Sequence, residues 1–132
     1  MEKLSTKKIL LVDDERIFLW LLAKQLGECE NNYCILTAED SHRAMKLLES
    51  EPVDLIVTDF KMPGTDGAEL VSHLKGKYPA IPVIVMSAHL RPEVERKLRG
   101  LGVSQFIDKS LLSDGSDVLE KMILEILKTS NL

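Results

Sequence analysis

The chain has 132 residues, enough for one domain whose core needs no disulfide or metal. Hydrophobic residues make up 45% and charged residues 29%, an ordinary composition for a soluble protein. The formal net charge of −4 argues against nonspecific nucleic-acid binding, which needs a basic face. No apolar run could cross a membrane, and Cys29 and Cys34 fit neither a redox pair nor a zinc set, so we expect a cytoplasmic protein with reduced thiols.

An apolar run at residues 9–12 predicts the first strand, which ends abruptly in three consecutive acids. Helical spacing follows over 16–26, and Gly27 is expected to end this helix. Four apolar side chains are predicted to face the core: Ile17, Leu21, Leu22 and Leu26. Phe18 and Trp20 add apolar bulk beyond that face, so Trp20 either anchors a partner or lies flat against its neighbours' aliphatic stems.

The second strand is predicted at 33–38, followed by a helix over 41–50 with Ser41 as its N-cap. The apolar run 53–57 is bounded by breakers on both sides, as is typical of a strand buried on both faces. Asp59 lies where this strand gives way to a loop. Since ligands of open α/β sheets bind at the carboxyl ends of strands, Asp59 is either an accessible functional carboxylate or simply the start of a turn.

The rest of the chain continues the alternation of helices and strands. The predicted elements are a helix at 67–77, a strand at 81–86, a helix at 92–99, a strand at 103–107 and a helix at 116–128. Strands alternate with helices throughout, which indicates an α/β domain with a parallel sheet covered on both faces. We expect the domain to span 7–128, between a flexible leader, 1–6, and a tail, 129–132.

Polar side chains stand at four of the predicted strand ends, which converge on one edge of a doubly wound sheet. They are Asp13 with Asp14, Asp59, Ser87 and Lys109. Three carboxylates held together repel one another, and a divalent cation relieves that repulsion. Mg²⁺ suits carboxylate oxygens and leaves room for a phosphoryl oxygen, while an ammonium and a hydroxyl group could bind the remaining phosphoryl oxygens.

The chain resembles the receiver domain of two-component response regulators over nearly its whole length. The matching stretches are LVDDE, VTDFKMPGTDG, VIVMSA and QFIDKS, each at the end of its own predicted strand. The resemblance implies a flavodoxin-like, doubly wound, five-stranded parallel sheet of order 2-1-3-4-5 with five helices. It also implies a signalling switch that catalyses only its own phosphorylation and dephosphorylation.

The resemblance implies that Asp59 accepts a phosphoryl group from a phosphohistidine on a sensor histidine kinase or a histidine phosphotransfer domain. Mg²⁺ would be held by Asp13, Asp14, Asp59 and the backbone carbonyl of Lys61. The signal would pass to a downstream protein or to a missing output domain, without direct contact to nucleic acid or membrane. Dimerisation on phosphorylation is left open.

The resemblance also assigns roles to side chains around the acceptor. Lys109 would offset charge on the transferring group, Ser87 would move to bond a phosphoryl oxygen, and Phe106 would swing inward to fill the vacated space. Lys61 and His89 stand at positions that tune the rate of phosphoryl loss in this family. Phe106 has no hydroxyl group, so a switch here works through packing alone.

The sequence departs from the family pattern at Ser110, where a proline in a cis bond usually follows the lysine. A non-proline cis bond costs about 3–4 kcal/mol, so the bond is expected to be trans or strained. The sequence also bears on three rival functions. A phosphohydrolase is disfavoured because Lys61 replaces its second acid, and a flavodoxin-type nucleotide site because the acids after the first strand repel phosphate. A phosphorylation-independent interaction module stays open.

Overall fold

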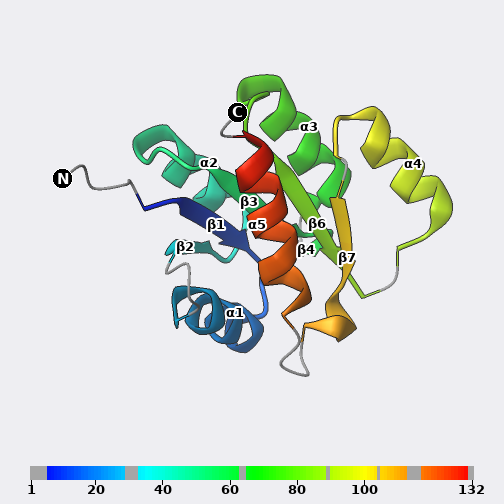
Figure 1. The fold of residues 1–132 in the computed structure, drawn as a ribbon. Helices are drawn as coiled ribbons and strands as arrows, with labels where there is room; N and C mark the ends of the chain where they lie inside the picture. Colours follow the sequence, from blue (N-terminus) through cyan, green and yellow to red (C-terminus); the bar gives the residue numbers. More distant parts are fainter. Residues whose placement is uncertain are drawn as a thin grey trace.

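A five-stranded parallel sheet forms the centre of the computed structural model, which describes residues 6–28, 33–62, 65–88, 90–103, 105–112 and 117–130. The strands of the sheet are β1 (Lys8–Val12), β2 (Cys34–Ala38), β3 (Leu55–Asp59), β6 (Val83–Ser87) and β7 (Gln105–Asp108). They lie side by side in the order β2-β1-β3-β6-β7 (Figure 1). This is the predicted order 2-1-3-4-5 of a doubly wound, flavodoxin-like sheet, and it is confirmed.

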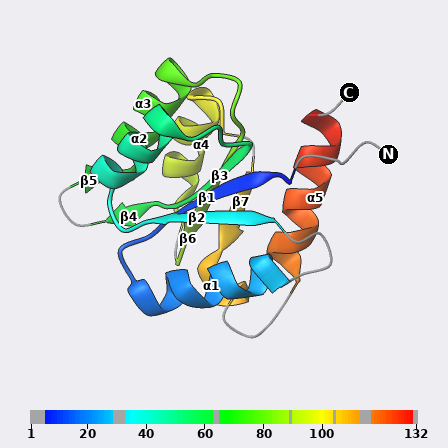
Figure 2. The same ribbon diagram turned by 90° about the vertical axis from the view of Figure 1, so that its left-hand side faces the viewer.

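Five helices cover the two faces of the sheet. They are α1 (Arg16–Glu28), α2 (Ser41–Ser50), α3 (Gly67–Lys77), α4 (Pro92–Gly100) and α5 (Val118–Ser130). Figure 2 shows α1 and α5 on one side of the sheet and α2, α3 and α4 on the other. Parallel strands need such crossovers, and both faces of the sheet are buried as a result.

The central strand β3 is buried along its whole length. Leu55 and Val57 pack into the cluster that includes α1 and α5, whereas Ile56 packs into the cluster that includes α2, α3 and α4. Because apolar side chains are needed on both faces, β3 reads as a continuous apolar run instead of an alternating one. The rigid strand then holds the backbone of Asp59 in place at its carboxyl end.

The buried face of α1 differs from the prediction. Ile17 and Leu21 were expected to face the core, but they are 77% and 52% exposed. The helix instead buries Leu19, Leu22 and Leu26, and it continues through Gly27 to Glu28. Residues 17–22 are all apolar, so their spacing alone does not choose between the possible faces of the helix.

Two further corrections concern caps and short strands. Asp40, not Ser41, is the N-cap of α2: its side chain accepts a hydrogen bond from the backbone N–H of Arg43 at 2.7 Å. An antiparallel hairpin of β4 (Lys61–Met62) and β5 (Thr65–Asp66) follows the central strand. Strands of two residues are too short to show the alternation on which sequence prediction depends.

Some predictions fall on residues outside the described ranges, including those about Cys29, His89 and the start of the last helix at residue 116. Cys34 lies in a described range, carries a free thiol and is half-buried. The last helix extends to Ser130, and the boundaries of the domain stay a prediction. Among the described residues, no helix is both long and apolar enough to cross a membrane.

Gly102 follows α4 with a φ of +109°, a conformation that favours glycine. We expect Gly102→Ala to lower the free energy of unfolding by about 1–2 kcal/mol, because a Cβ at this φ is strained. The nearest atoms to that Cβ belong to the flexible side chain of Lys75 at 3.5 Å, so strain dominates over a clash. Urea unfolding measures the loss.

Gly76→Ala is the matched control for this experiment. Gly76 lies in α3, and a Cβ there meets nothing within 4 Å. Alanine at this helical position should be neutral or stabilise the fold by up to about 1 kcal/mol. Equal losses at the two glycines would contradict the backbone explanation.

Candidate functional site

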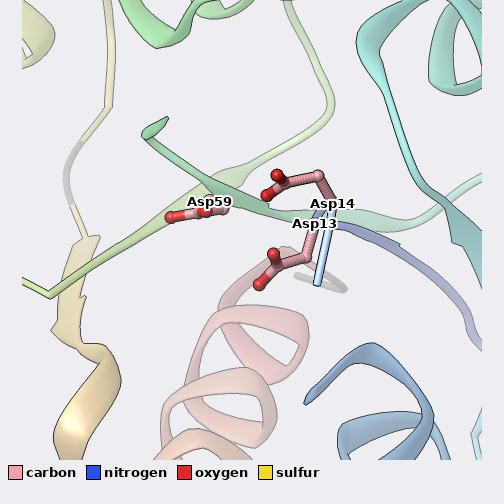
Figure 3. Close-up of side chains that lie close together, drawn as sticks. All are labelled: Asp13, Asp14 and Asp59. Atoms are coloured by element: carbon pink, nitrogen blue, oxygen red, sulfur yellow. The ribbon is translucent and has the colours of Figure 1, made fainter. Parts of the chain in front are cut away.

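The register of β1 and β3 brings two aspartates together at the carboxyl edge of the sheet. Val12 pairs with Thr58, so Asp13 stands level with Asp59 on the neighbouring strand. One carboxylate oxygen from each of Asp13, Asp14 and Asp59 lies within 4.8 Å of the others (Figure 3). Asp13 and Asp59 are buried and Asp14 is exposed, so the cluster is open to solvent on one side.

Lys109 joins this cluster from the end of β7. Its Nζ lies 2.9 Å from Oδ2 of Asp13 and 3.4 Å from Oδ2 of Asp59, and it also contacts the carboxylate of Glu15. Only 11% of the Lys109 side chain is exposed. One ammonium group is therefore shared among three carboxylates at the edge of the sheet.

Burial and hydrogen bonding shift the pKa values of this cluster in opposite directions. Burial raises the pKa of Asp13 above its ordinary value, although hydrogen bonds from the Glu15 backbone N–H and from Lys109 act in the opposite direction. Burial acts to lower the pKa of Lys109, but its hydrogen bonds to Glu15 and Asp13 outweigh burial and raise it. The charged form of Lys109 is therefore stabilised, whereas burial disfavours the ionised form of Asp13.

The donor set matches a divalent metal ion. Hard cations such as Mg²⁺ and Ca²⁺ take oxygen ligands, and the cluster offers three carboxylates. Asp13 is fully buried with a raised pKa, so added positive charge next to it would be favourable. The acidic cluster of Asp13, Asp14 and Asp59 could thus hold a metal ion.

Ser87 and Phe106 lie on the strands beside Asp59. Ser87 is the buried last residue of β6, and Asp59 pairs with the preceding residue, Met86. Phe106 is half-buried on β7, where the guanidinium carbon of Arg99 lies 4.8 Å from the centre of its ring. The backbone of Lys61 lies in β4, while its side chain and the whole of His89 are outside what the structure describes.

The peptide bond between Lys109 and Ser110 is trans, since no cis bond occurs in the described part of the chain. A short 3₁₀ helix, η1 (Lys109–Leu111), begins here. Asp108 caps it: one oxygen of its side chain accepts both the backbone N–H and the hydroxyl of Ser110 at 2.9 Å. These two hydrogen bonds hold the turn after Lys109, although residue 110 is not a proline.

Sequence reasoning missed two contacts of Lys109. Glu15 pairs with its ammonium, and the ring of Phe18 lies 4.6 Å from the same nitrogen. Two signals could have found them: Glu15 is the third acid in the run after β1, and Phe18 follows three residues later, so both lie on one side of the helix start. The contacts themselves depend on how α1 is rotated, which the sequence did not settle.

The sequence matches the family described as "Response regulator receiver domain" over residues 9–123. The response regulator GtcR of Aneurinibacillus migulanus is 36% identical over 104 residues, which cover 79% of this chain and 42% of that protein. The alkaline phosphatase synthesis transcriptional regulatory protein PhoP of Bacillus subtilis is 35% identical over 105 residues, covering 78% and 42%. The chain thus spans less than half the length of these two relatives.

Solved structures agree with the sequence comparisons. A CheY-like receiver domain protein from Methanospirillum hungatei superposes with a TM-score of 0.85 at 26% identity, over 96% of this chain and 98% of that one. The response regulator TrrA of Thermotoga maritima, in complex with Mg²⁺-BeF, gives a TM-score of 0.76 at 29% identity, over 92% and 99%. With the matching family and the acidic edge of the sheet, these similarities show that the chain belongs to the receiver domains of two-component response regulators.

Proposed function

We propose that this receiver domain accepts a phosphoryl group on the carboxylate of Asp59. The donor is a phosphohistidine on a sensor histidine kinase or a histidine phosphotransfer domain. One observation carries the proposal: Asp59 lies beside both negative and positive groups. It belongs to the acidic cluster with Asp13 and Asp14, and its Oδ2 lies 3.4 Å from Nζ of Lys109. A nucleophile, a metal-binding set and a cation for the phosphoryl oxygens thus share one edge of the sheet.

Asp13, Asp14 and Asp59 would hold Mg²⁺, joined by the backbone carbonyl of Lys61. Bound there, Mg²⁺ would offset negative charge on the phosphoryl group. An oxygen of Asp59 attacks the phosphorus, and the new O–P bond forms as the N–P bond to the donor imidazole breaks. The released nitrogen takes up a proton, while Lys109 binds a phosphoryl oxygen, so positioning and charge supply most of the catalysis.

The new dianion then biases the packing of the neighbouring strands. The hydroxyl of Ser87 moves to a phosphoryl oxygen, and Phe106 turns inward, which breaks its contact with Arg99 and reshapes the surface of α4 and β7. Lys61 and His89 tune how quickly the phosphoryl group is lost. The changed surface signals to a downstream protein or to an output domain in a longer chain, and it can also support a dimer.

The exposed face of α1 is the surface that we assign to the phosphohistidine donor. Ile17, Trp20 and Leu21 form this face, which we call the α1 patch, and Trp20 is 59% exposed. The patch lies on the helix whose start contributes Glu15 and Phe18 to the surroundings of Lys109. The ammonium of Lys24 lies 5.1 Å from the centre of the Trp20 ring, so the ring is supported on one side by a charged neighbour.

Trp20→Ala should slow phosphotransfer from the donor protein about tenfold or more, since a central aromatic side chain commonly dominates an interface. The rate is measured with the histidine kinase or phosphotransfer domain that phosphorylates the native chain fastest. Phosphorylation by acetyl phosphate, which needs no docking, is the control and should be unchanged. An unaltered rate from the protein donor would remove Trp20 from the interface.

Intact mass after incubation with acetyl phosphate and Mg²⁺ tests the function itself. A single phosphoryl adduct is expected, and it should vanish when EDTA removes the metal. The rate at which the adduct decays then measures the phosphoryl lifetime. If the native chain forms no adduct, the interaction module that needs no phosphorylation becomes the leading function.

A further inference from the structure

The ammonium of Lys109 lies closer to the start of α1 than to Asp59. It contacts Glu15 directly and is 3.4 Å from the nearest oxygen of Asp59. The ring of Phe18 lies 4.6 Å from the same nitrogen, within the range of a cation–π contact. Two side chains that the proposed phosphoryl chemistry does not use therefore draw Lys109 toward α1.

Glu15 differs from the other carboxylates around Lys109. Asp13 and Asp59 are buried and belong to the acidic cluster, whereas the side chain of Glu15 is 64% exposed and lies outside that cluster. The backbone of Glu15 is fixed at both ends: its N–H donates to Asp13 at 3.0 Å, and its carbonyl accepts from the N–H of Leu19 at 2.9 Å. The Glu15 carboxylate can therefore rotate into solvent while the backbone stays in place.

We propose that Glu15 is a positioning residue that competes with the phosphoryl group for the ammonium of Lys109. The proposal rests on the function proposed above. An ammonium group has three donors on a flexible stem, so it exchanges one anionic partner for another readily. When a phosphoryl group is present on Asp59, Lys109 turns from Glu15 to the new oxygens and stays within reach of the Phe18 ring. Glu15 thereby limits how tightly the site holds a phosphoryl group.

Beryllofluoride tests this competition without phosphoryl transfer, because on a carboxylate it stands in for the phosphoryl group. We expect Glu15→Gln to bind beryllofluoride about two- to fivefold more tightly than the native chain at saturating Mg²⁺, the scale of an ion pair whose acidic partner is exposed. Titration followed by ¹⁹F NMR measures the affinity. The gain should shrink at about 0.5 M salt, because exposed charges are then screened.

The controls separate contact from overall charge and from folding. Glu49→Gln removes one negative charge from the exposed surface of α2 and should bind beryllofluoride as the native chain does. Glu15→Asp keeps the carboxylate and should stay within about twofold of the native affinity. Glu15→Ala, a second way to remove the charge, should show the same gain as Glu15→Gln. Urea unfolding of each variant verifies that it folds.

If both Glu15→Gln and Glu15→Ala bound beryllofluoride with the native affinity, the competition would be overturned. Weaker binding of beryllofluoride would also overturn it, because Glu15 would then hold Lys109 in its productive place. A gain of the same size in Glu49→Gln would also overturn it, because charge alone would then suffice. These failures leave the phosphoryl adduct of the native chain intact. A native chain that forms no adduct and binds no beryllofluoride would instead overturn the proposed function, and the inference with it.

Discussion

Asp59→Asn should lower the rate of phosphorylation by acetyl phosphate about 100-fold or more. The phosphoryl adduct should therefore disappear. The amide of asparagine is nearly the same size as the carboxylate but is not a nucleophile, so no O–P bond can form. The substitution also removes the negative charge of one of the three carboxylates that could hold a metal ion. Intact mass, recorded over a time course at saturating Mg²⁺, measures the adduct.

Asp40→Asn is the matched control for the acceptor. Asp40 is the N-cap of α2, and asparagine serves this role as well as aspartate, so the fold should be unaffected. This variant should form the adduct at the native rate. A persistent adduct in Asp59→Asn would place the acceptor elsewhere and would overturn the role that we propose for Asp59.

Asp13→Asn should make the metal-free protein more stable at neutral pH and remove its stabilisation by Mg²⁺. The pKa of Asp13 is raised in the folded state, mainly by burial, so keeping Asp13 ionised costs folding free energy. A neutral amide avoids that cost. For the native chain, Mg²⁺ at tens of times its Kd should add about 2 kcal/mol to the free energy of unfolding, whereas the variant should gain little.

The pH dependence of this difference follows from the direction of the shift. Below the ordinary Asp pKa of 3.8, Asp13 is protonated in both the folded and the unfolded state, and the ionisation of Asp13 then gives the variant no advantage in the free energy of unfolding. As the pH rises from there through the higher pKa of the folded state, the native chain loses stability relative to the variant. Urea unfolding with EDTA and with Mg²⁺, from pH 4 upward, measures both effects.

Asp117→Asn provides the control for removing an exposed acid. The side chain of Asp117 is 61% exposed and, within the described part of the chain, forms an ion pair with Lys121 and no other residue, so its loss should leave the response to Mg²⁺ unchanged. If Asp13→Asn were stabilised by Mg²⁺ as strongly as the native chain, Asp13 would not be a metal ligand.

The sheet and the place of the site could be predicted because both follow from short-range features of the chain. Leu55, Ile56 and Val57 form a short apolar run between breakers, which is typical of a strand covered on both faces, and the alternation with helices indicates that the strands are parallel. Asp59 and Lys109 are distant in sequence, yet each stands at the end of a predicted strand. Since the carboxyl ends of parallel strands share one edge, the fold brings these two side chains together.

The rotation of α1 and the contacts that depend on it could not be predicted. Six consecutive apolar residues, 17–22, fit several helical faces equally well, and only packing against the sheet selects Leu19 and Leu22 for burial. The same rotation places Glu15 and Phe18 beside Lys109. Such contacts join segments far apart in sequence, and they carry no periodic signal of their own.

Trp20 is the only tryptophan of the chain, and its exposure in the fold determines what fluorescence can report. An indole that is already largely in water changes its surroundings little when the chain unfolds, so its emission is a poor measure of unfolding. A protein that covers the α1 patch would instead transfer the ring into an apolar contact and shift its emission to shorter wavelengths. The fluorescence of Trp20 can therefore report binding of a protein at the α1 patch without any added label.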